Sequence, residues 1–387
     1  MAGSDVIVVG GGINGCSIAF NLAKAGLTVI LAERDFIASG PTGRSSAIIR
    51  QHYSNEVTAR MALRSWQVWK NFDDVVGGDA GFEQTGFLLG AGEESINELK
   101  ANIKMQQKVG IDTRFVTLAE IKELDPQASI EGLAGAAYEP GSGFADPAAA
   151  SNAFVERAKA LGATVMLDTR VTALQAKGGR ISGVVTDKGE LAAGAVVIAA
   201  GPWTPFLTRM IGLELPITSS RHEVAVYQRP ASFNRQVVFG DFKEQVYMRP
   251  ETGGLMLVGG IENIEDTVDP DNYSEKIEFD TIADFAERVS RRYPVMATGV
   301  SAGGWASLYD ITPDWHPIMG PLPDVAGLYC TAGGSGHGFK LAPAVGEMMA
   351  ELIVNGSKPE ADINLFFFER FSQGRLITGQ YEQSIVG

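Results

Sequence analysis

Residues 6–15 read VIVVGGGING, four apolar β-forming residues that run directly into a glycine turn of the pattern G-x-G-x-x-G. The pattern after this turn predicts a helix from Ser17 to Ala25, a second apolar strand from Thr28 to Ala32, and an acidic residue, Glu33, at its end. Strand, glycine turn, helix, strand and acidic residue in this order make up the dinucleotide-binding βαβ fingerprint. The stretch therefore predicts an α/β fold whose first unit binds a dinucleotide.

The glycines of this turn have separate steric tasks. Gly10 allows the tight turn, Gly12 lets the backbone approach a pyrophosphate, and Gly15 lets the helix pack on the strand. The free N–H groups and the positive dipole end of the helix favour phosphates. Glu33 stands where a carboxylate can accept hydrogen bonds from ribose hydroxyls. The residues that we expect this unit to bring to a cofactor are Gly10, Gly12, Ile13, Asn14, Gly15, Glu33 and Arg34.

Composition narrows the class of protein. The chain has 387 residues, which favours two domains, and its net charge of −14 argues against a nucleic-acid partner. Cys16 and Cys330 form no C-x-x-C motif, so a disulfide framework and a zinc site are disfavoured, and we expect no metal. No apolar run reaches the ~18 residues of a membrane span. We expect a cytoplasmic enzyme without a signal peptide or a membrane span.

Two later strands also run into glycine turns. Residues 195–200 (AVVIAA) lead into Gly201, and residues 327–332 (GLYCTA) lead into the turn 333–338. If all three glycine turns face one dinucleotide, its domain is discontinuous, and the strand-rich stretches between form a second, substrate domain built on an antiparallel sheet. The predicted boundaries are 1–82, 143–217 and 310–387 for the Rossmann-like domain, and 83–142 and 218–309 for the second.

The remaining pattern predicts further elements. Helices are expected over residues 55–75, 95–109, 117–124, 279–292 and 340–354. Another helix should run from Pro147 to about residue 161, with Asp146 as its N-cap. Strands are expected at 163–167, 170–175, 245–249 and 255–259, together with a hairpin over 181–200.

Three more stretches carry a family resemblance: GRSSAIIR at 43–50, LYDITPD at 308–314 and GSGHGFK at 334–340. In this order they resemble the D-amino-acid-oxidase-type flavoproteins, most closely the sarcosine oxidase and proline dehydrogenase branch. The resemblance implies FAD rather than NAD as the cofactor. It adds these residues to the expected cofactor site: Gly43, Arg44, Ser45, Ser46, Val171, Ala200, Gly201, Trp203, Gly334, Gly336, His337, Gly338, Phe339 and Lys340.

The same resemblance implies an amino-acid substrate, often N-alkylated, whose carboxylate is held by an arginine and a lysine. The matching positions are Arg50 and Lys340, and this pair of cations suits a carboxylate. Tyr53 and Tyr309 match tyrosines that line the family's substrate pocket, and Tyr247 is a looser match. The expected reaction is oxidation of the C–N bond by hydride transfer to the flavin N5, giving an imine that hydrolyses. No residue stands out as a general base.

The chain also departs from the family. Residues 305–309 lack the cysteine to which several of these oxidases attach flavin, and no histidine lies between Gly40 and Arg50, so we expect non-covalent FAD. No lysine lies between Lys243 and Lys276, where the monomeric oxidases carry one that activates oxygen. The electron acceptor is therefore O2, as in an oxidase, or a partner protein or quinone, as in a dehydrogenase that can be a subunit of a hetero-oligomer.

Other interpretations stay open. A polyamine substrate is disfavoured by Arg50 and Lys340, whereas oxidation of a hydroxy compound and a non-catalytic FAD-binding assembly role remain alternatives. We interpret His52, His222 and His316 as structural residues, and Arg249 as a further candidate for the substrate pocket. The sequence leaves open the exact substrate, its stereochemistry and the oligomeric state.

Overall fold

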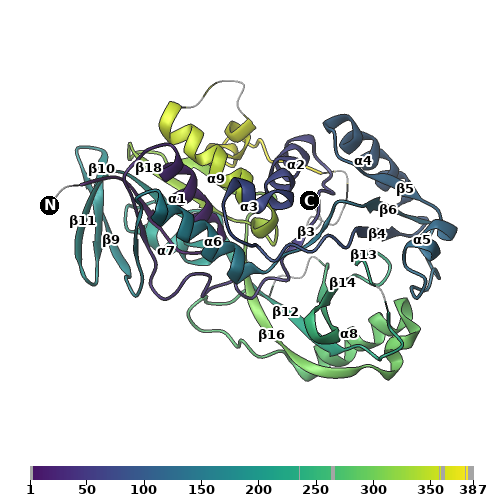
Figure 1. Ribbon diagram of the computed structural model, residues 1–387. Coiled ribbons are helices and arrows are strands. Elements are labelled where there is room, and N and C mark those ends of the chain that lie inside the picture. The colour runs from purple at the N-terminus through teal and green to yellow at the C-terminus, as the bar shows by residue number, and fades with distance from the viewer. Residues whose placement is uncertain are drawn as a thin grey trace.

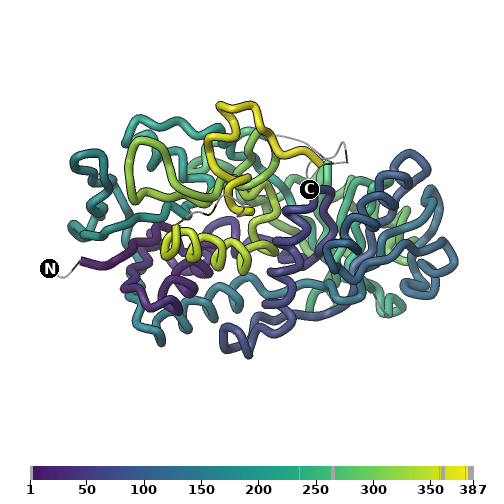
Figure 2. The backbone as a smooth tube through the Cα atoms, turned by 90° about the horizontal axis from the view of Figure 1, so that it is seen from above, coloured from purple at the N-terminus to yellow at the C-terminus, as the bar shows by residue number. Residues whose placement is uncertain are grey.

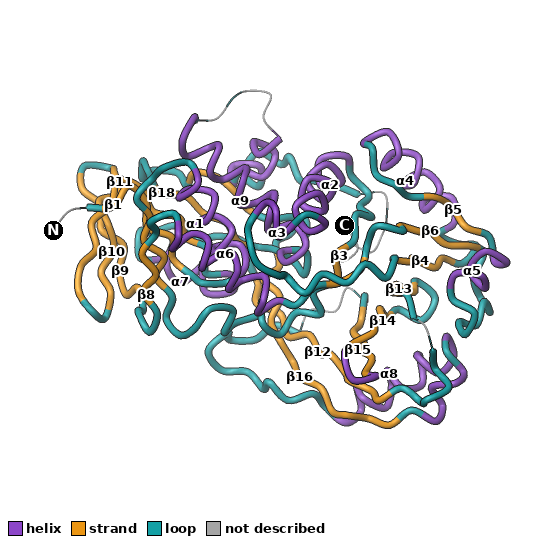
Figure 3. Tube along the Cα trace, in the orientation of Figure 1, coloured by secondary structure: helices purple, strands orange, loops and turns teal. Residues whose placement is uncertain are grey.

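Two eight-stranded sheets lie at opposite ends of the molecule, with helices between them (Figures 1 and 3). The computed structural model describes residues 3–234, 236–262, 266–356, 358, 362–379 and 381. Strands far apart in the sequence share each sheet, so the chain crosses between the two sheets several times.

The first sheet is built around parallel strands. Its order is β17 (Ile318–Pro321), β18 (Leu328–Ala332), β11 (Gly189–Ile198), β1 (Ser4–Val9), β2 (Val29–Ala32) and β8 (Thr164–Met166), and β9 (Val171–Lys177) and β10 (Arg180–Thr186) extend it beside β11. The strands from β18 to β8 pair in parallel. The central strands β1, β2 and β18 are mostly apolar and buried, as expected where both faces of a parallel sheet are covered.

Helices pack on this sheet and on one another (Figures 1 and 2). They are α1 (Ile13–Lys24), α2 (Glu56–Lys70), α3 (Phe72–Val75), α6 (Pro147–Ala160), α7 (Thr204–Arg209) and α9 (Gly338–Asn355). Helices α1 and α9 approach closely, because a Cβ placed on Gly346 would lie 2.1 Å from Ser17 Oγ. As predicted, Asp146 caps α6 by accepting hydrogen bonds from the N–H groups of Ala148 and Ala149.

The second sheet is mostly antiparallel. Its order is β16 (Val300–Ile311), β12 (Thr218–Gln228), β15 (Leu255–Gly260), β14 (Val246–Glu251), β13 (Val238–Asp241), β4 (Phe87–Ala91), β6 (Gly135–Glu139) and β5 (Arg114–Val116), with β13 and β4 parallel. Helix α8 (Phe279–Arg292) packs Phe285 against Met248 and Val258 on one face of this sheet. Since side chains alternate along a strand, Tyr247 and Gly259 belong to the opposite face.

The remaining elements join these layers. Helices α4 (Ile96–Val109) and α5 (Leu118–Leu124) belong to the second sheet's end of the molecule (Figure 1). A two-stranded ribbon of β3 (Ile48–Ile49) and β7 (Gly143–Phe144) runs between the two sheets.

The predicted α/β class is confirmed, with corrections to individual elements. Helix α1 begins at Ile13 rather than Ser17, because Gly12 is already its N-cap. The helix predicted over 55–75 is two helices, since Asn71 leaves the helical conformation between α2 and α3. The predicted domain boundaries remain a prediction. Within the described ranges, no helix is both long and apolar enough to cross a membrane.

Candidate functional site

A large cavity of about 990 Å³ runs between the two sheets. This volume is at the upper end of the range for ligand sites. We call one part the glycine end, which is lined by Gly10, Gly12, Glu33, Ala200 and Trp203. We call the other the tyrosine end, which is lined by Arg50, Leu89, Tyr247, Tyr309 and Lys340. The cavity therefore has room for an extended ligand and a second, small one.

Three glycine turns meet at the glycine end. Strands β1, β11 and β18 are neighbours and run in parallel, so their carboxyl ends share one edge of the sheet. The turns that follow them place Gly10, Gly201 and Gly334 in the cavity wall. The three strand-and-turn units thus face one cavity, as the pattern predicts. This edge of a parallel sheet is where α/β proteins bind ligands.

The first turn has no room for larger residues. Gly10 has a φ of +112°, and a Cβ there would lie 2.4 Å from the Ala199 carbonyl oxygen. A Cβ on Gly15 would lie 2.0 Å from the Gly10 carbonyl oxygen. Gly12, the N-cap of helix α1, has no side chain to cap the helix, and the Ile13 N–H donates to Thr42 Oγ1 at 3.1 Å. The first turn of α1 still offers backbone N–H groups and a positive dipole end to an anion, which fits the pyrophosphate of a dinucleotide.

The Glu33 side chain holds this turn through hydrogen bonds to backbone N–H groups. One carboxylate oxygen accepts the Gly11 N–H at 2.6 Å, and the other accepts the Asp35 N–H at 2.8 Å. The side chain is buried and also lines the cavity. Glu33 is thus placed both to fix the glycine turn and to face a ligand.

Asp271, which lies between strands β15 and β16 of the second sheet, completes the cavity wall beside Arg34 and Trp203. The Arg34 guanidinium stacks on the Trp203 indole at 4.0 Å. Asp271 accepts hydrogen bonds from Trp203 Nε1 at 2.7 Å and from Arg34 Nη1 at 3.2 Å. Sequence reasoning missed Asp271, because nothing in its turn-rich surroundings indicates that it reaches the other half of the molecule.

The last glycine turn is held by Asp310. Its carboxylate accepts the Gly333 N–H at 2.7 Å, and its carbonyl accepts the Ser335 N–H at 2.9 Å. Burial raises the pKa of Asp310, and the backbone donors of Gly333 and Gly334 oppose that rise. Helix α9 begins directly after this turn, at His337, without a side-chain cap. A second helix N-terminus therefore opens at the cavity, where Gly338 lies beside Asn14 of α1.

Two cationic side chains meet at the tyrosine end. Arg50 follows β3, and Lys340 lies in the first turn of α9. The Arg50 guanidinium lies 4.6 Å from the Tyr53 ring and donates to the His52 carbonyl, while Lys340 Nζ donates to the Gly336 carbonyl at 3.3 Å. Burial, and then the charge of Arg50, lower the pKa of Lys340 well below its usual value. An anionic ligand would relieve both effects and favour the charged lysine.

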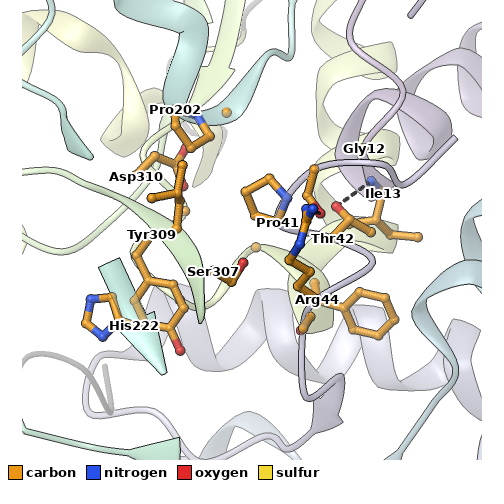
Figure 4. A pocket seen from close by; sticks show the side chains of 18 of the residues that line it. Gly12, Ile13, Pro41, Thr42, Arg44, Pro202, His222, Ser307, Tyr309 and Asp310 are labelled. Atoms are coloured by element: carbon orange, nitrogen blue, oxygen red, sulfur yellow. Dashed lines mark hydrogen bonds between the residues drawn. The ribbon is translucent and has the colours of Figure 1, made fainter. Parts of the chain in front are cut away.

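Tyr309 and His222 form the sheet side of this end (Figure 4). Their rings stack with centroids 4.0 Å apart, and Ser307 lies beside them. Burial lowers the pKa of His222 to about 4, so the ring is neutral at physiological pH. Burial also raises the pKa of Tyr247 and of Tyr309, so both keep their hydroxyl protons. His222, interpreted from sequence as structural, lines the cavity instead, because β12 turns it to the same face as Tyr309.

Most of the residues predicted for the site line the cavity, and four do not. Those that line it are Gly10, Gly12, Ile13, Asn14, Glu33, Arg34, Arg44, Ser45, Ser46, Arg50, Val171, Ala200, Gly201, Trp203, Tyr247, Tyr309, Gly334, Gly336, Gly338, Phe339 and Lys340. Gly15 and Gly43 instead support turns behind the wall, each against a backbone carbonyl. The Tyr53 hydroxyl and His337 Nδ1 are hydrogen-bonded at 3.2 Å, and the Arg50 guanidinium lies over the Tyr53 ring.

The candidate Arg249 and the two histidines interpreted as structural, His52 and His316, also lie outside the cavity wall. Arg249 lies over the Phe144 ring and pairs with Glu251 at 2.7 Å. His52 and His316 are buried, with ring nitrogens bonded to Tyr381 and Asn55. Among the described residues, no group of three or more histidine, cysteine or acidic side chains is arranged to hold a metal ion.

Comparison with known proteins gives concordant matches. The sequence profile of FAD dependent oxidoreductases (DAO) matches residues 5–352. The chain is 28% identical to the mitochondrial sarcosine dehydrogenase of Mus musculus, covering 95% of this chain but 41% of that protein, and 28% identical to a sarcosine oxidase subunit beta of an Arthrobacter species, covering 96% and 92%. The solved structure of L-proline dehydrogenase from P. horikoshii superposes with a TM-score of 0.90 at 32% identity, covering 97% of this chain and 99% of that one. The chain thus spans about two fifths of the sarcosine dehydrogenase it matches.

Proposed function

The chain belongs to the family of FAD-dependent oxidoreductases, and from this premise we propose that it oxidises the C–N bond of a small N-substituted or cyclic amino acid, as a cytoplasmic enzyme. The relatives named above act, by their names, on sarcosine or proline. The observation that carries the proposal is the convergence of Arg50 and Lys340 on the tyrosine end of the cavity, from positions 290 residues apart in the sequence.

The glycine end supports FAD as the cofactor. Two helix N-termini and three glycine turns lie along the same wall, and Gly10 has no space for a side chain. Bound FAD supplies the two-electron oxidation of the C–N bond. We propose that it is held without a covalent bond, because both cysteines, Cys16 and Cys330, are buried and neither lines the cavity.

The chain's own side chains orient the substrate. We assign the carboxylate to Arg50, whose planar guanidinium can bind it bidentately, and to Lys340. The carboxylate opposes the lowering of the Lys340 pKa and so favours the charged lysine. Tyr309 and Tyr247 present hydroxyl groups that keep their protons, so they act as hydrogen-bond donors and not as bases. This anchoring fixes which carbon of the substrate faces the cofactor.

The second part of the proposal concerns the electron acceptor. Lys340 is the one lysine among the described residues that lines the cavity, and it is assigned to the carboxylate. A second lysine at the flavin would stabilise developing superoxide, so we expect a slow reaction with oxygen. We propose a dehydrogenase that passes its electrons to a partner protein or a quinone, as a possible subunit of a hetero-oligomer.

Anaerobic titration of the purified flavoprotein tests both parts. Sarcosine, L-proline, D-alanine and glycine are added in turn while the flavin absorbance is followed, and air is then admitted. Bleaching by sarcosine or L-proline with slow reoxidation is the expected result. Fast reoxidation that forms peroxide would overturn the proposed electron acceptor. If none of the four amino acids bleaches the flavin, the proposed substrate class is wrong and the non-catalytic role is favoured.

A further inference from the structure

Building on the proposed function, we infer that an apolar wall around Gly240 restricts the substrate to amino acids whose N-substituent or ring is short and uncharged. The wall consists of Ile48, Phe87, Leu89 and Ile261, together with Gly240 itself. All four side chains are at most 8% exposed, and they belong to one hydrophobic cluster, against which Tyr247 and Tyr309 also pack.

Strand register places Gly240 in the floor of this wall. Gly240 on β13 pairs with Leu89 on β4 and with Tyr247 on β14. Residues paired across neighbouring strands point to the same face of the sheet. Because Leu89 and Tyr247 both line the cavity, Gly240 leaves a gap between them. A Cβ at Gly240 would lie only 2.9 Å from Leu89 Cδ1, so Leu89 already leans over that gap.

The wall adjoins the cations that are assigned to the carboxylate. Arg50 lines the same cavity as Tyr247 and Tyr309, and both tyrosines pack against the cluster that contains the wall. Tyr247 in turn is the strand neighbour of Gly240. Ile48, in β3, lies two residues before Arg50, and both residues line the cavity. A substrate held by Arg50 therefore extends its carbon substituents along the apolar wall.

The wall itself carries no charge, since Ile48, Phe87, Leu89, Ile261 and Gly240 are all apolar. Among the carboxylates that line the cavity, Glu223, Glu262 and Asp284 are paired with Arg221 or Arg288 at 2.7–2.9 Å. Asp310 is engaged by the Gly333 N–H. Burial of an unpaired charge against Phe87 and Leu89 is strongly unfavourable. The wall therefore selects against both acidic and basic substituents.

The test compares wild type with Gly240→Ala and Leu89→Ala over sarcosine, N-ethylglycine, L-proline, L-pipecolate and N-methyl-L-aspartate. In Gly240→Ala the new methyl group meets only the tip of a flexible side chain, and it pushes Leu89 into the cavity. We expect kcat/KM for L-pipecolate to fall about tenfold or more while the value for sarcosine changes less than about threefold. Leu89→Ala should shift the preference towards L-pipecolate, and N-methyl-L-aspartate should be the poorest substrate throughout.

Leu99→Ala is the matched control, because Leu99 is fully buried in the same cluster but does not line the cavity. It should lower stability without changing the order of substrates. An unchanged order in both Gly240→Ala and Leu89→Ala, or efficient oxidation of N-methyl-L-aspartate, would overturn the inference while leaving the proposed function intact. Failure of every amino acid to bleach wild type would instead overturn the proposed function itself.

Discussion

The two ends of the cavity differ in the kind of group that lines them: backbone groups dominate at one end and side chains at the other. At the glycine end, main-chain groups do most of the work: three turns at the edge of a parallel sheet and two helix N-termini. At the tyrosine end, side chains do so: Arg50 and Lys340 on one side, and Tyr247, Tyr309 and His222 from the face of the second sheet on the other.

This contrast implies opposite sensitivities. A site made of backbone fails when an atom is added, because there is no room for a Cβ beside a carbonyl oxygen. A site made of side chains fails when a charge or ring is removed, because its neighbours lose their partner. The following variants test that division, beginning with the largest effect.

Arg50→Met should lower kcat/KM for the preferred amino acid about a thousandfold, because a buried carboxylate then loses its bidentate partner. The FAD content of the purified protein should stay at the wild-type level, since Arg50 lies outside the glycine end. Arg249→Met is the matched control, a buried arginine that packs on Phe144 away from the cavity. Steady-state kinetics gives kcat/KM for both variants, and absorbance gives their FAD content. A loss of FAD in Arg50→Met would contradict the division between the two ends.

Gly10→Ala should weaken FAD binding about a hundredfold, since φ there is +112° and the new methyl group would meet the Ala199 carbonyl. Gly26→Ala is the control: its φ is also positive, at +87°, but nothing lies within 4 Å of its Cβ position. Fluorescence titration of the apoprotein with FAD measures both affinities. Equal weakening in the two variants would show that backbone strain alone, without the close contact, explains the effect.

Acid should weaken the tyrosine end first. Burial lowers the native-state pKa of His222 to about 4, whereas the unfolded chain takes up that proton near pH 6.5. The unfolded state therefore binds more protons as pH falls from 6.5 towards 4, and at pH 5 His222 removes about 2 kcal/mol of stability. Chemical denaturation at pH 7.5 and pH 5 checks this value. His222→Phe should reduce the difference by that amount, and an unaltered difference would count against a buried, neutral ring.

Asp271→Asn should give the smallest effect. Arg34 and Asp271 are partly exposed, at 28% and 54%, and such pairs contribute about 0–1 kcal/mol. We expect FAD to dissociate about threefold faster at low ionic strength, with the difference vanishing near ~1 M KCl because salt screens the pair. Stopped-flow measurement of FAD release gives the rate. A difference that persists in high salt would assign the effect to the hydrogen bond from Trp203 instead.

Local sequence alone indicates the glycine end, whereas the tyrosine end is indicated only through the family resemblance, and the reason is physical. The turn from Gly10 to Gly15 is specified by local steric needs, which leave a readable spacing. Arg50 and Lys340 could be placed only through family resemblance. Asp271 and Gly240 escaped notice, and His222 was interpreted as structural, because their positions depend on which strands pair and in what register. The segment 218–228 does not alternate cleanly between polar and apolar residues, so it does not reveal which face His222 takes.

The order of strands in the first sheet has a consequence for biosynthesis. Strand β1 ends at Val9, yet its neighbour β11 spans Gly189–Ile198, and the next strand, β18, spans Leu328–Ala332. The glycine end is therefore incomplete until most of the chain has left the ribosome. Contacts of such long sequence separation also form slowly. FAD must consequently be captured by a chain that is already largely synthesised, and until then the apolar edges of β1 and β11 depend on chaperones or rapid folding to avoid aggregation.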